Sequence, residues 1–394
     1  MNFKFLFQGI SLWILNVLLL TRAESINECE ELKNNWSNNV YLTNLEKLID
    51  CEINQELIDK LATCSEINYI QLIQVPLNEE LNFKPFRNLN KLTSLSIDYQ
   101  IMRKYKPLRV RNNVIKYFPN LKILTLLDVI IGKSALDEIG TLKNLHSLDI
   151  SKTTFDEDST LHSFKSLSNL TYLTIESYQK SLKRISTSIN YLTNLDTLVI
   201  RANGADLAFM THRTLKNLKN LNTLDVTNDI GLNLDKIGDL TNLEYLYLTC
   251  KNITSIPDSI GNLKKLKEID LFGNPISVIP DTIGNLENLV NLYLGDNRIE
   301  TLPDSIGNLK NLKYLYLARN QITEIPSSIG NMTCLERLTL SNNKLQSIPD
   351  SIGNLKNLKY LYLDHNNITT IPDSIKNSTT IKELYLSDNP INKE

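Results

Sequence analysis

Residues that could carry out catalysis or bind a metal are few in this sequence and poorly spaced for either task. The four histidines are scattered over the chain, none with a partner at metal-ligand spacing: His146, His162, His212 and His365. No glycine-rich phosphate loop, nucleophile elbow or zinc-protease motif occurs. An aspartate does recur between a proline and a Ser or Thr, where a turn or helix-cap role is much commoner than catalysis: Asp281, Asp304, Asp350 and Asp373. We therefore predict no enzymatic activity, metal or cofactor.

Tyrosine is the residue whose placement does indicate a function, namely ligand binding. Eight of the 16 tyrosines alternate with apolar residues in short stretches: Tyr245, Tyr247, Tyr293, Tyr314, Tyr316, Tyr360, Tyr362 and Tyr385. If these stretches are strands, the tyrosines share the face opposite the apolar side chains. Tyrosine is enriched at interfaces because it combines a large contact area with a polar tip. The same residues would also stabilise an exposed sheet, and copying of a repeat unit would spread them without selection for binding.

These tyrosines belong to a repeat with a fixed period of 23 residues. The pattern Leu266-x-x-Ile269-x-Leu271-x-x-Asn274 recurs from five later positions: Leu289, Leu312, Leu335, Leu358 and Ile381. Between the copies runs a second phrase, I-P-D-T-I-G-N-L at residues 279–286, with small changes elsewhere. The apolar residues of one copy form only a slice of core and must stack on the next copy. We expect the asparagine amide to bond to unpaired backbone groups at the turn, the proline to fix the return path and the glycine to end it.

This motif resembles the typical leucine-rich repeats of Ras-interacting scaffolds and of many extracellular recognition proteins. The resemblance is close over residues 243–391 and looser before them. It implies an α/β repeat solenoid, that is, a leucine-rich repeat horseshoe with a parallel concave β-sheet. The eight tyrosines would then lie on the concave face. Because the motif is shared by proteins with different partners, the resemblance implies the architecture and leaves the ligand open.

The expected domain boundaries follow from where the pattern holds. Residues 67–394 are the predicted repeat domain of about fourteen repeats, irregular over 67–242 and regular over 243–394. Residues 24–66 are expected to form a helical N-terminal cap, because apolar residues recur there at helical spacing around Trp36 and Leu57. Three cysteines fall in this span, and a disulfide between Cys29 and either Cys51 or Cys64 would suit an oxidising compartment.

Residues 1–23 have the pattern of a secretory signal peptide, with Lys4 ahead of an apolar run from Ile10 to Leu20 and Ala23 before the cleavage point. The alternative is an uncleaved signal anchor. No other stretch is long and apolar enough to predict a membrane span. In a secreted protein, six sequons become candidate glycosylation sites: Asn35, Asn169, Asn252, Asn331, Asn367 and Asn377. The net charge of −2 does not favour nucleic acid as a partner.

These observations favour a secreted, extracellular protein that recognises a protein, peptide or glycan ligand on its concave face. Two alternatives stay open: a cytoplasmic signalling scaffold of the Ras-interacting type, if residues 1–23 are not a signal peptide, and an inhibitor of a secreted hydrolase. The copy that contains Leu384 and Leu386 has no following copy to cover its apolar side, which allows an end-to-end homodimer.

Overall fold

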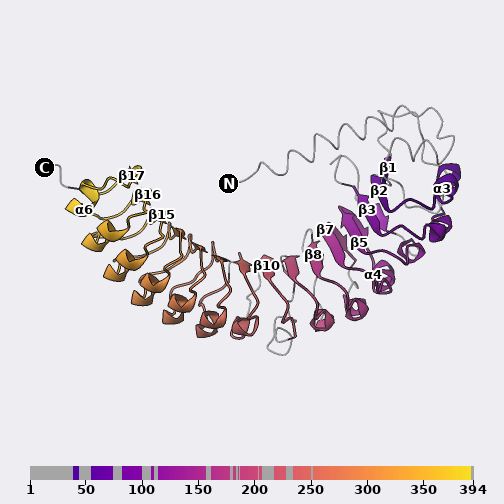
Figure 1. Ribbon diagram of the computed structural model, residues 1–394, viewed down its shortest axis with the longest axis horizontal. Coiled ribbons are helices and arrows are strands. Elements are labelled where there is room, and N and C mark those ends of the chain that lie inside the picture. Colours follow the sequence, from indigo (N-terminus) through magenta and orange to yellow (C-terminus); the bar gives the residue numbers. More distant parts are fainter. Residues whose placement is uncertain are drawn as a thin grey trace. The chain divides into compact units, whose positions relative to one another are not determined.

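A computed structural model describes thirteen segments of the chain: residues 39–43, 55–73, 82–99, 108–110, 114–156, 161–177, 181–182, 185, 187–202, 204–205, 217–227, 234–249 and 252–391. The chain divides into two compact units, Met1–Leu182 and Lys183–Glu394. Each unit is a ladder of parallel strands joined by short helical return segments, and each is described below by itself (Figure 1).

Unit 1 contains one main parallel ladder, in the order β1 (Asn39–Thr43), β2 (Tyr69–Ile73), β3 (Ser94–Asp98), β5 (Ile123–Leu127), β7 (Ser147–Phe155) and β8 (Tyr172–Ser177). A second short ladder joins β4 (Leu108–Val110), β6 (Val129–Ile131) and the end of β7. The described return segments are α3 (Gln55–Leu61), η1 (Lys84–Asn88), η2 (Ile115–Tyr117), α4 (Lys133–Ile139) and η3 (His162–Ser166).

Unit 2 continues the same design with shorter strands. Its ladder runs β9 (Thr197–Arg201), β10 (Thr223–Thr227), β11 (Tyr245–Leu248), β12 (Glu268–Asp270), β13 (Asn291–Tyr293), β14 (Tyr314–Tyr316), β15 (Arg337–Thr339), β16 (Tyr360–Tyr362) and β17 (Glu383–Tyr385). The described return segments are η4 (Thr187–Tyr191), η5 (Ile237–Asp239), η6 (Asp258–Asn262), η7 (Asp281–Asn285), η8 (Asp304–Asn308), η9 (Ser327–Asn331), η10 (Asp350–Asn354) and α6 (Asp373–Lys376). Within this unit the strands line the inner, concave side and the helical turns the outer side (Figure 1).

The core follows from the alternation in the sequence. Leu315 and Leu317 are fully buried, whereas Tyr314 and Tyr316, which alternate with them, are only half-buried. Each repeat predicted from Ile67 onward contributes a strand. The parallel sheet of a leucine-rich repeat solenoid is thereby confirmed. Most of the described return segments are short 3-10 helices of three to five residues.

The repeated asparagine has the role expected of it. Asn320 is 8% exposed, and its Nδ2 donates to the carbonyl oxygens of Leu317 at 3.1 Å and of Leu294, in the preceding repeat, at 2.9 Å. Its Oδ1 accepts a hydrogen bond from the Ile299 N–H at 3.0 Å. The same three bonds recur at Asn274, Asn297, Asn343, Asn366 and Asn389. This asparagine ladder ties each turn to its neighbour.

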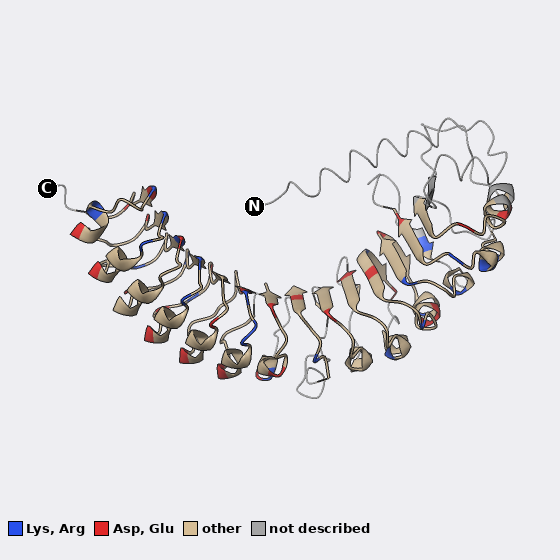
Figure 2. Cartoon of the chain, in the orientation of Figure 1, with Lys and Arg blue, Asp and Glu red and all other residues tan. Residues whose placement is uncertain are grey.

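The prediction that the repeated glycine ends the return segment is wrong. Gly307 is buried inside η8, and a Cβ at this position would lie 2.3 Å from the carbonyl oxygen of Ser328 in the next repeat. The glycine therefore allows two neighbouring return segments to touch. The repeated aspartate also differs slightly from expectation, since the proline is the cap residue and Asp304 is the first residue of η8. Figure 2 shows acidic residues, in red, at the outer tips of most helical turns in unit 2.

The span predicted as a helical cap contains both an expected and an unexpected element. Helix α3 lies at the predicted helical stretch around Leu57 and buries Ile58 and Leu61, while the stretch around Trp36 lies outside the described residues. Strand β1 was not predicted, yet it lies in the same span and pairs in register with β2, Val40 opposite Ile70 and so on. The ladder therefore begins before Ile67, and the cap stays a prediction.

Cysteine pairing also stays a prediction. Cys64 is buried, whereas Cys29 and Cys51, its candidate partners in the cap, lie outside the described residues. Cys334 is a free thiol. In the part of the chain that the structure describes, no helix has the length and apolar character needed to cross a membrane.

Candidate functional site

Two columns of side chains run across the strands of unit 2 on the face opposite the buried leucines. Column 1 follows the strand register through Thr223, Tyr245, Glu268, Asn291, Tyr314, Arg337, Tyr360 and Glu383. Column 2 follows it through Asp225, Tyr247, Asp270, Tyr293, Tyr316, Thr339, Tyr362 and Tyr385. Neighbours in a column are about 4.8 Å apart along the backbone, which is close enough for direct side-chain contact.

All eight tyrosines singled out from the sequence lie in these two columns. They are half-buried, except for Tyr385 on the last strand, which is 47% exposed. The leucines that alternate with them, such as Leu315 and Leu361, are fully buried. The predicted placement of the tyrosines is thus confirmed, and their role in ligand binding stays a prediction.

Column 2 contains two stacked tyrosine pairs. The ring centroids of Tyr293 and Tyr316 are 4.7 Å apart with an interplanar angle of 11°, and those of Tyr362 and Tyr385 are 4.8 Å apart at 8°. The Tyr362 hydroxyl donates a hydrogen bond to Glu383 Oε2 at 2.9 Å. Burial raises the pKa of Tyr293 to about 12, and the nearby charge of Glu268 adds to the rise. The rings are therefore held in place by one another, and this phenol stays protonated at neutral pH.

Charge is distributed unevenly along the columns. Asp225, Glu268 and Asp270 lie near the beginning of the columns, where Arg201 pairs with Asp225 at 2.7 Å. Burial raises the pKa of the Asp270 carboxyl, although the Phe272 N–H donates to it at 2.9 Å; Glu268 and Asp225 add to the rise. Further along lies Arg337, whose guanidinium carbon is 4.4 Å from the ring centroid of Tyr360.

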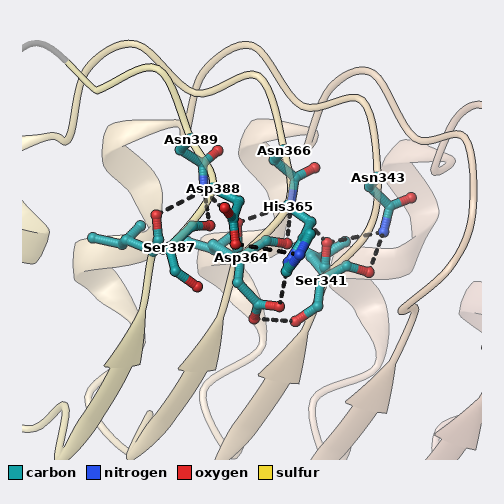
Figure 3. Close-up of polar contacts among 11 residues, drawn as sticks. Ser341, Asn343, Asp364, His365, Asn366, Ser387, Asp388 and Asn389 are labelled. Atoms are coloured by element: carbon teal, nitrogen blue, oxygen red, sulfur yellow. Dashed lines mark hydrogen bonds and ion pairs between the residues drawn. The ribbon is translucent and has the colours of Figure 1, made fainter.

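A polar cluster lies beside the columns, where β15 and β16 run into their turns (Figure 3). Ser341 Oγ donates to Asp364 Oδ1 at 2.6 Å, and the two ring nitrogens of His365 lie 3.2 Å from carboxylate oxygens of Asp364 and Asp388. The serine bonds to the aspartate and not to the histidine, so the histidine is not placed to activate its hydroxyl as it does in a triad. The cluster thus has the residue types of a catalytic triad without its geometry.

Sequence reasoning missed this cluster because it treated His365 as isolated. The signal was present in the 23-residue period, since Ser341 and Asp364 occupy the same position in successive repeats, as do His365 and Asp388. Each of the pair His365 and Asp388 has a left-handed backbone, with φ near 55°. That conformation turns both side chains toward the same side of the ladder (Figure 3).

Comparison with known families decides the classification. The family model described as a leucine-rich repeat region matches residues 226–313 and 304–393. Residues 226–393 are a leucine-rich repeat region. The resemblance inferred from the motif is thereby confirmed, and the matched region contains strands β11 to β17 with the eight tyrosines. No curated protein matches the chain.

Solved structures similar to this leucine-rich repeat protein come from several sources. A leucine-rich repeat protein of Leptospira interrogans is 26% identical, with a TM-score of 0.70, and the match covers 89% of this chain and 95% of that one. An internalin of Listeria monocytogenes is 21% identical, with a TM-score of 0.59, over 96% of this chain and 93% of that one. The plant peptide hormone receptor RGFR1, in complex with RGF2, is 27% identical, with a TM-score of 0.57, over 76% of this chain and 52% of the receptor.

The remaining candidate sites are those for a metal ion and for glycans. Among the described residues, no group of three or more His, Cys, Asp or Glu side chains could hold a metal ion. Five of the six sequon asparagines are described and exposed, and none lies in a column: Asn169, Asn252, Asn331, Asn367 and Asn377. Asn35 and the expected signal peptide lie outside the described residues.

Proposed function

We propose that this leucine-rich repeat protein binds a protein or peptide ligand, without catalysis, through columns 1 and 2. The observation that carries the proposal is the tyrosine surface: eight half-buried or exposed rings on five strands of one ladder, four of them in stacked pairs. Rings fixed by a sheet lose little conformational freedom when a ligand arrives, so more of the contact energy remains for affinity. Interfaces of high affinity typically depend on such tyrosine-rich centres.

The kind of ligand is inferred from two further points. A plant peptide hormone receptor with 27% identity was solved in complex with RGF2, and its match covers 76% of this chain. That receptor extends well beyond the match, so its ligand does not transfer directly to this protein. Together with the extended, aromatic form of the columns, the comparison favours a peptide or protein segment over the glycan that the sequence also allowed.

The absence of catalysis rests on the polar cluster in Figure 3, which is the strongest catalytic candidate among the described residues. Asp364 accepts from Ser341 and faces His365, so the Ser–His hydrogen bond on which a triad depends is not formed. The cluster is instead suited to fix the turns after β15 and β16. Inhibition of a secreted hydrolase, the alternative kept from the sequence, would use the same columns and would appear as a protein ligand.

Binding is tested with a random nonapeptide library displayed on phage and selected on the full-length protein. We expect selected peptides to lose at least about tenfold in affinity when Tyr314, Tyr316, Tyr360 and Tyr362 are all changed to serine. The matched control is Tyr191→Ser, because Tyr191 is 63% exposed in η4, outside both columns. Circular dichroism confirms that each variant is folded. Equal loss in the control, or no loss in the quadruple variant, would contradict the proposal.

We also propose that the protein is secreted, that residues 1–23 are its signal peptide and that it carries glycans. The support is the apolar N-terminal pattern and the exposure of the five described sequon asparagines away from the columns. The test is the intact mass of protein from medium and cells of a eukaryotic host, before and after glycosidase treatment. Protein that begins at Glu24 and loses mass on treatment supports secretion, whereas full-length, unglycosylated protein in the cytosol would favour the scaffold alternative.

A further inference from the structure

Arg337 is a cation in column 1 that has no ion-pair partner among the described residues. Its carboxylate neighbour in sequence, Glu336, is paired with Lys359 at 2.8 Å and with Lys313 at 3.9 Å. No carboxylate among the described residues forms an ion pair with Arg337, and its Nε has no hydrogen-bond partner. The contrast is Arg201 on β9, which pairs with Asp225. Because the Nε is buried, the charge and the terminal Nη1 and Nη2 groups of Arg337 are what remain for another molecule.

The surroundings of Arg337 hold its guanidinium in place. In column 1 it lies between Tyr314 and Tyr360, while Tyr316 and Tyr362 occupy the two diagonal positions of column 2. The guanidinium carbon is 4.4 Å from the ring centroid of Tyr360 and 5.5 Å from that of Tyr362. A guanidinium that rests on aromatic faces keeps its N–H groups directed outward along its edge.

The position next to Arg337 is also distinctive. Thr339 takes the place in column 2 between the pair Tyr293–Tyr316 and the pair Tyr362–Tyr385, so the run of rings is interrupted there. The Thr339 hydroxyl is buried without a hydrogen-bond partner. A ligand side chain that enters between the two stacked pairs would thus meet the guanidinium edge with aromatic rings on either side.

We propose that Arg337, framed by its four tyrosines, binds the carboxylate of an Asp or Glu side chain in a peptide ligand. A carboxylate matches the guanidinium edge with two parallel hydrogen bonds, and the tyrosine hydroxyls add further donors. A doubly charged phosphate fits less well, because Glu383 lies in the same column next to Tyr360 and would repel it more strongly. This inference rests on the proposed function, since it names the chemistry of one contact within the same surface.

The experiment uses the peptides selected from the nonapeptide library on the full-length protein. We expect them to share an Asp or Glu at one position, and we expect Arg337→Gln to weaken their binding by about tenfold or more. Changing that acidic residue to its amide should cost the same, and combining both changes should cost no more than either alone. Arg337→Lys should recover part of the affinity, because it restores the charge without the two parallel bonds.

Two controls make the outcome decisive. Arg319→Gln removes an exposed arginine in the turn of the preceding repeat and should leave affinity unchanged. Arg337→Glu should prefer peptides in which the acidic residue is replaced by lysine. Peptides that need the four tyrosines but bind Arg337→Gln within about twofold of wild type would overturn the carboxylate site and leave the proposed function standing. If no selected peptide depends on the tyrosines, both proposals are wrong.

Discussion

The asparagine ladder allows a specific prediction, because some backbone groups would lose their hydrogen-bond partner on mutation and others would keep a second one. Replacing Asn320 with alanine leaves the Ile299 N–H without its partner in the core, which costs about 1–3 kcal/mol. It also removes two amide bonds, worth about 1 kcal/mol each, but the carbonyls of Leu294 and Leu317 each keep a second bond from a neighbouring asparagine. We expect Asn320→Ala to lower the free energy of unfolding by about 3–5 kcal/mol.

Two matched variants separate the ladder from a general effect of losing an amide. Asn389 makes the same set of bonds at the end of the ladder but is only partly buried, so water can replace them and the cost of Asn389→Ala should stay near 1 kcal/mol. Asn308 is exposed at the end of η8, and Asn308→Ala should cost close to nothing. The expected order of the three stability losses therefore depends only on the burial of each asparagine and on its bonds in the ladder.

Urea unfolding followed by far-UV circular dichroism measures these differences. Repeat arrays can unfold in parts, so amide hydrogen exchange at Ile299 supplies a local reading that does not assume a single transition. Protection of the Ile299 amide should fall in Asn320→Ala and stay unchanged in Asn308→Ala. If all three variants lose the same stability, or if Asn320→Ala loses less than about 1 kcal/mol, the reasoning from buried unpaired groups is wrong.

Three further predictions follow from single contacts. Gly307→Ala should lower the melting temperature and cost about 1–3 kcal/mol, because its Cβ would collide with the backbone of Ser328. Between pH 10 and 12 the Tyr293 phenol loses its proton in the unfolded chain but keeps it in the folded protein, where its pKa is raised. The free energy of unfolding therefore falls as pH rises through this range. In Tyr293→Phe the urea midpoint should fall less steeply with pH than in the wild type. Asp270→Asn should raise the urea midpoint at pH 7, because it removes a half-buried carboxylate near Glu268 and Asp225, and the gain should vanish in acid.

The regular repeats could be predicted because one physical requirement fixes most of their residues. Every copy must bury its leucines against the next copy, so the spacing of Leu312, Leu315 and Leu317 determines strand, face and neighbour together. That reasoning correctly located the strands from Ile67 onward and put the eight tyrosines on one face. The repeat pattern did not predict strand β1, because Ser37 occupies the position where later copies have an apolar residue ahead of Val40 and Leu42.

Side-chain contacts between repeats were harder to predict, since they depend on distances that the pattern alone does not contain. The role of Gly307 was misjudged because sequence spacing marks a segment end and a close approach in the same way. Likewise the sequence analysis did not single out Arg337, because the tyrosines beside it on the neighbouring strands become apparent from the strand register.

The same register explains why a binding surface can arise from a uniform scaffold. The buried positions of each repeat are held by packing, and the column positions are free to change, because a half-buried outward side chain contributes little to the core. Column 1 accordingly changes from Tyr314 to Arg337 to Tyr360 while Leu315, Leu338 and Leu361 behind it stay the same. Copying alone would have repeated tyrosine at every strand. The substitution of arginine and threonine on β15, between two stacked pairs, is therefore the place where this surface departs from its own repeat and where we expect ligand specificity to lie.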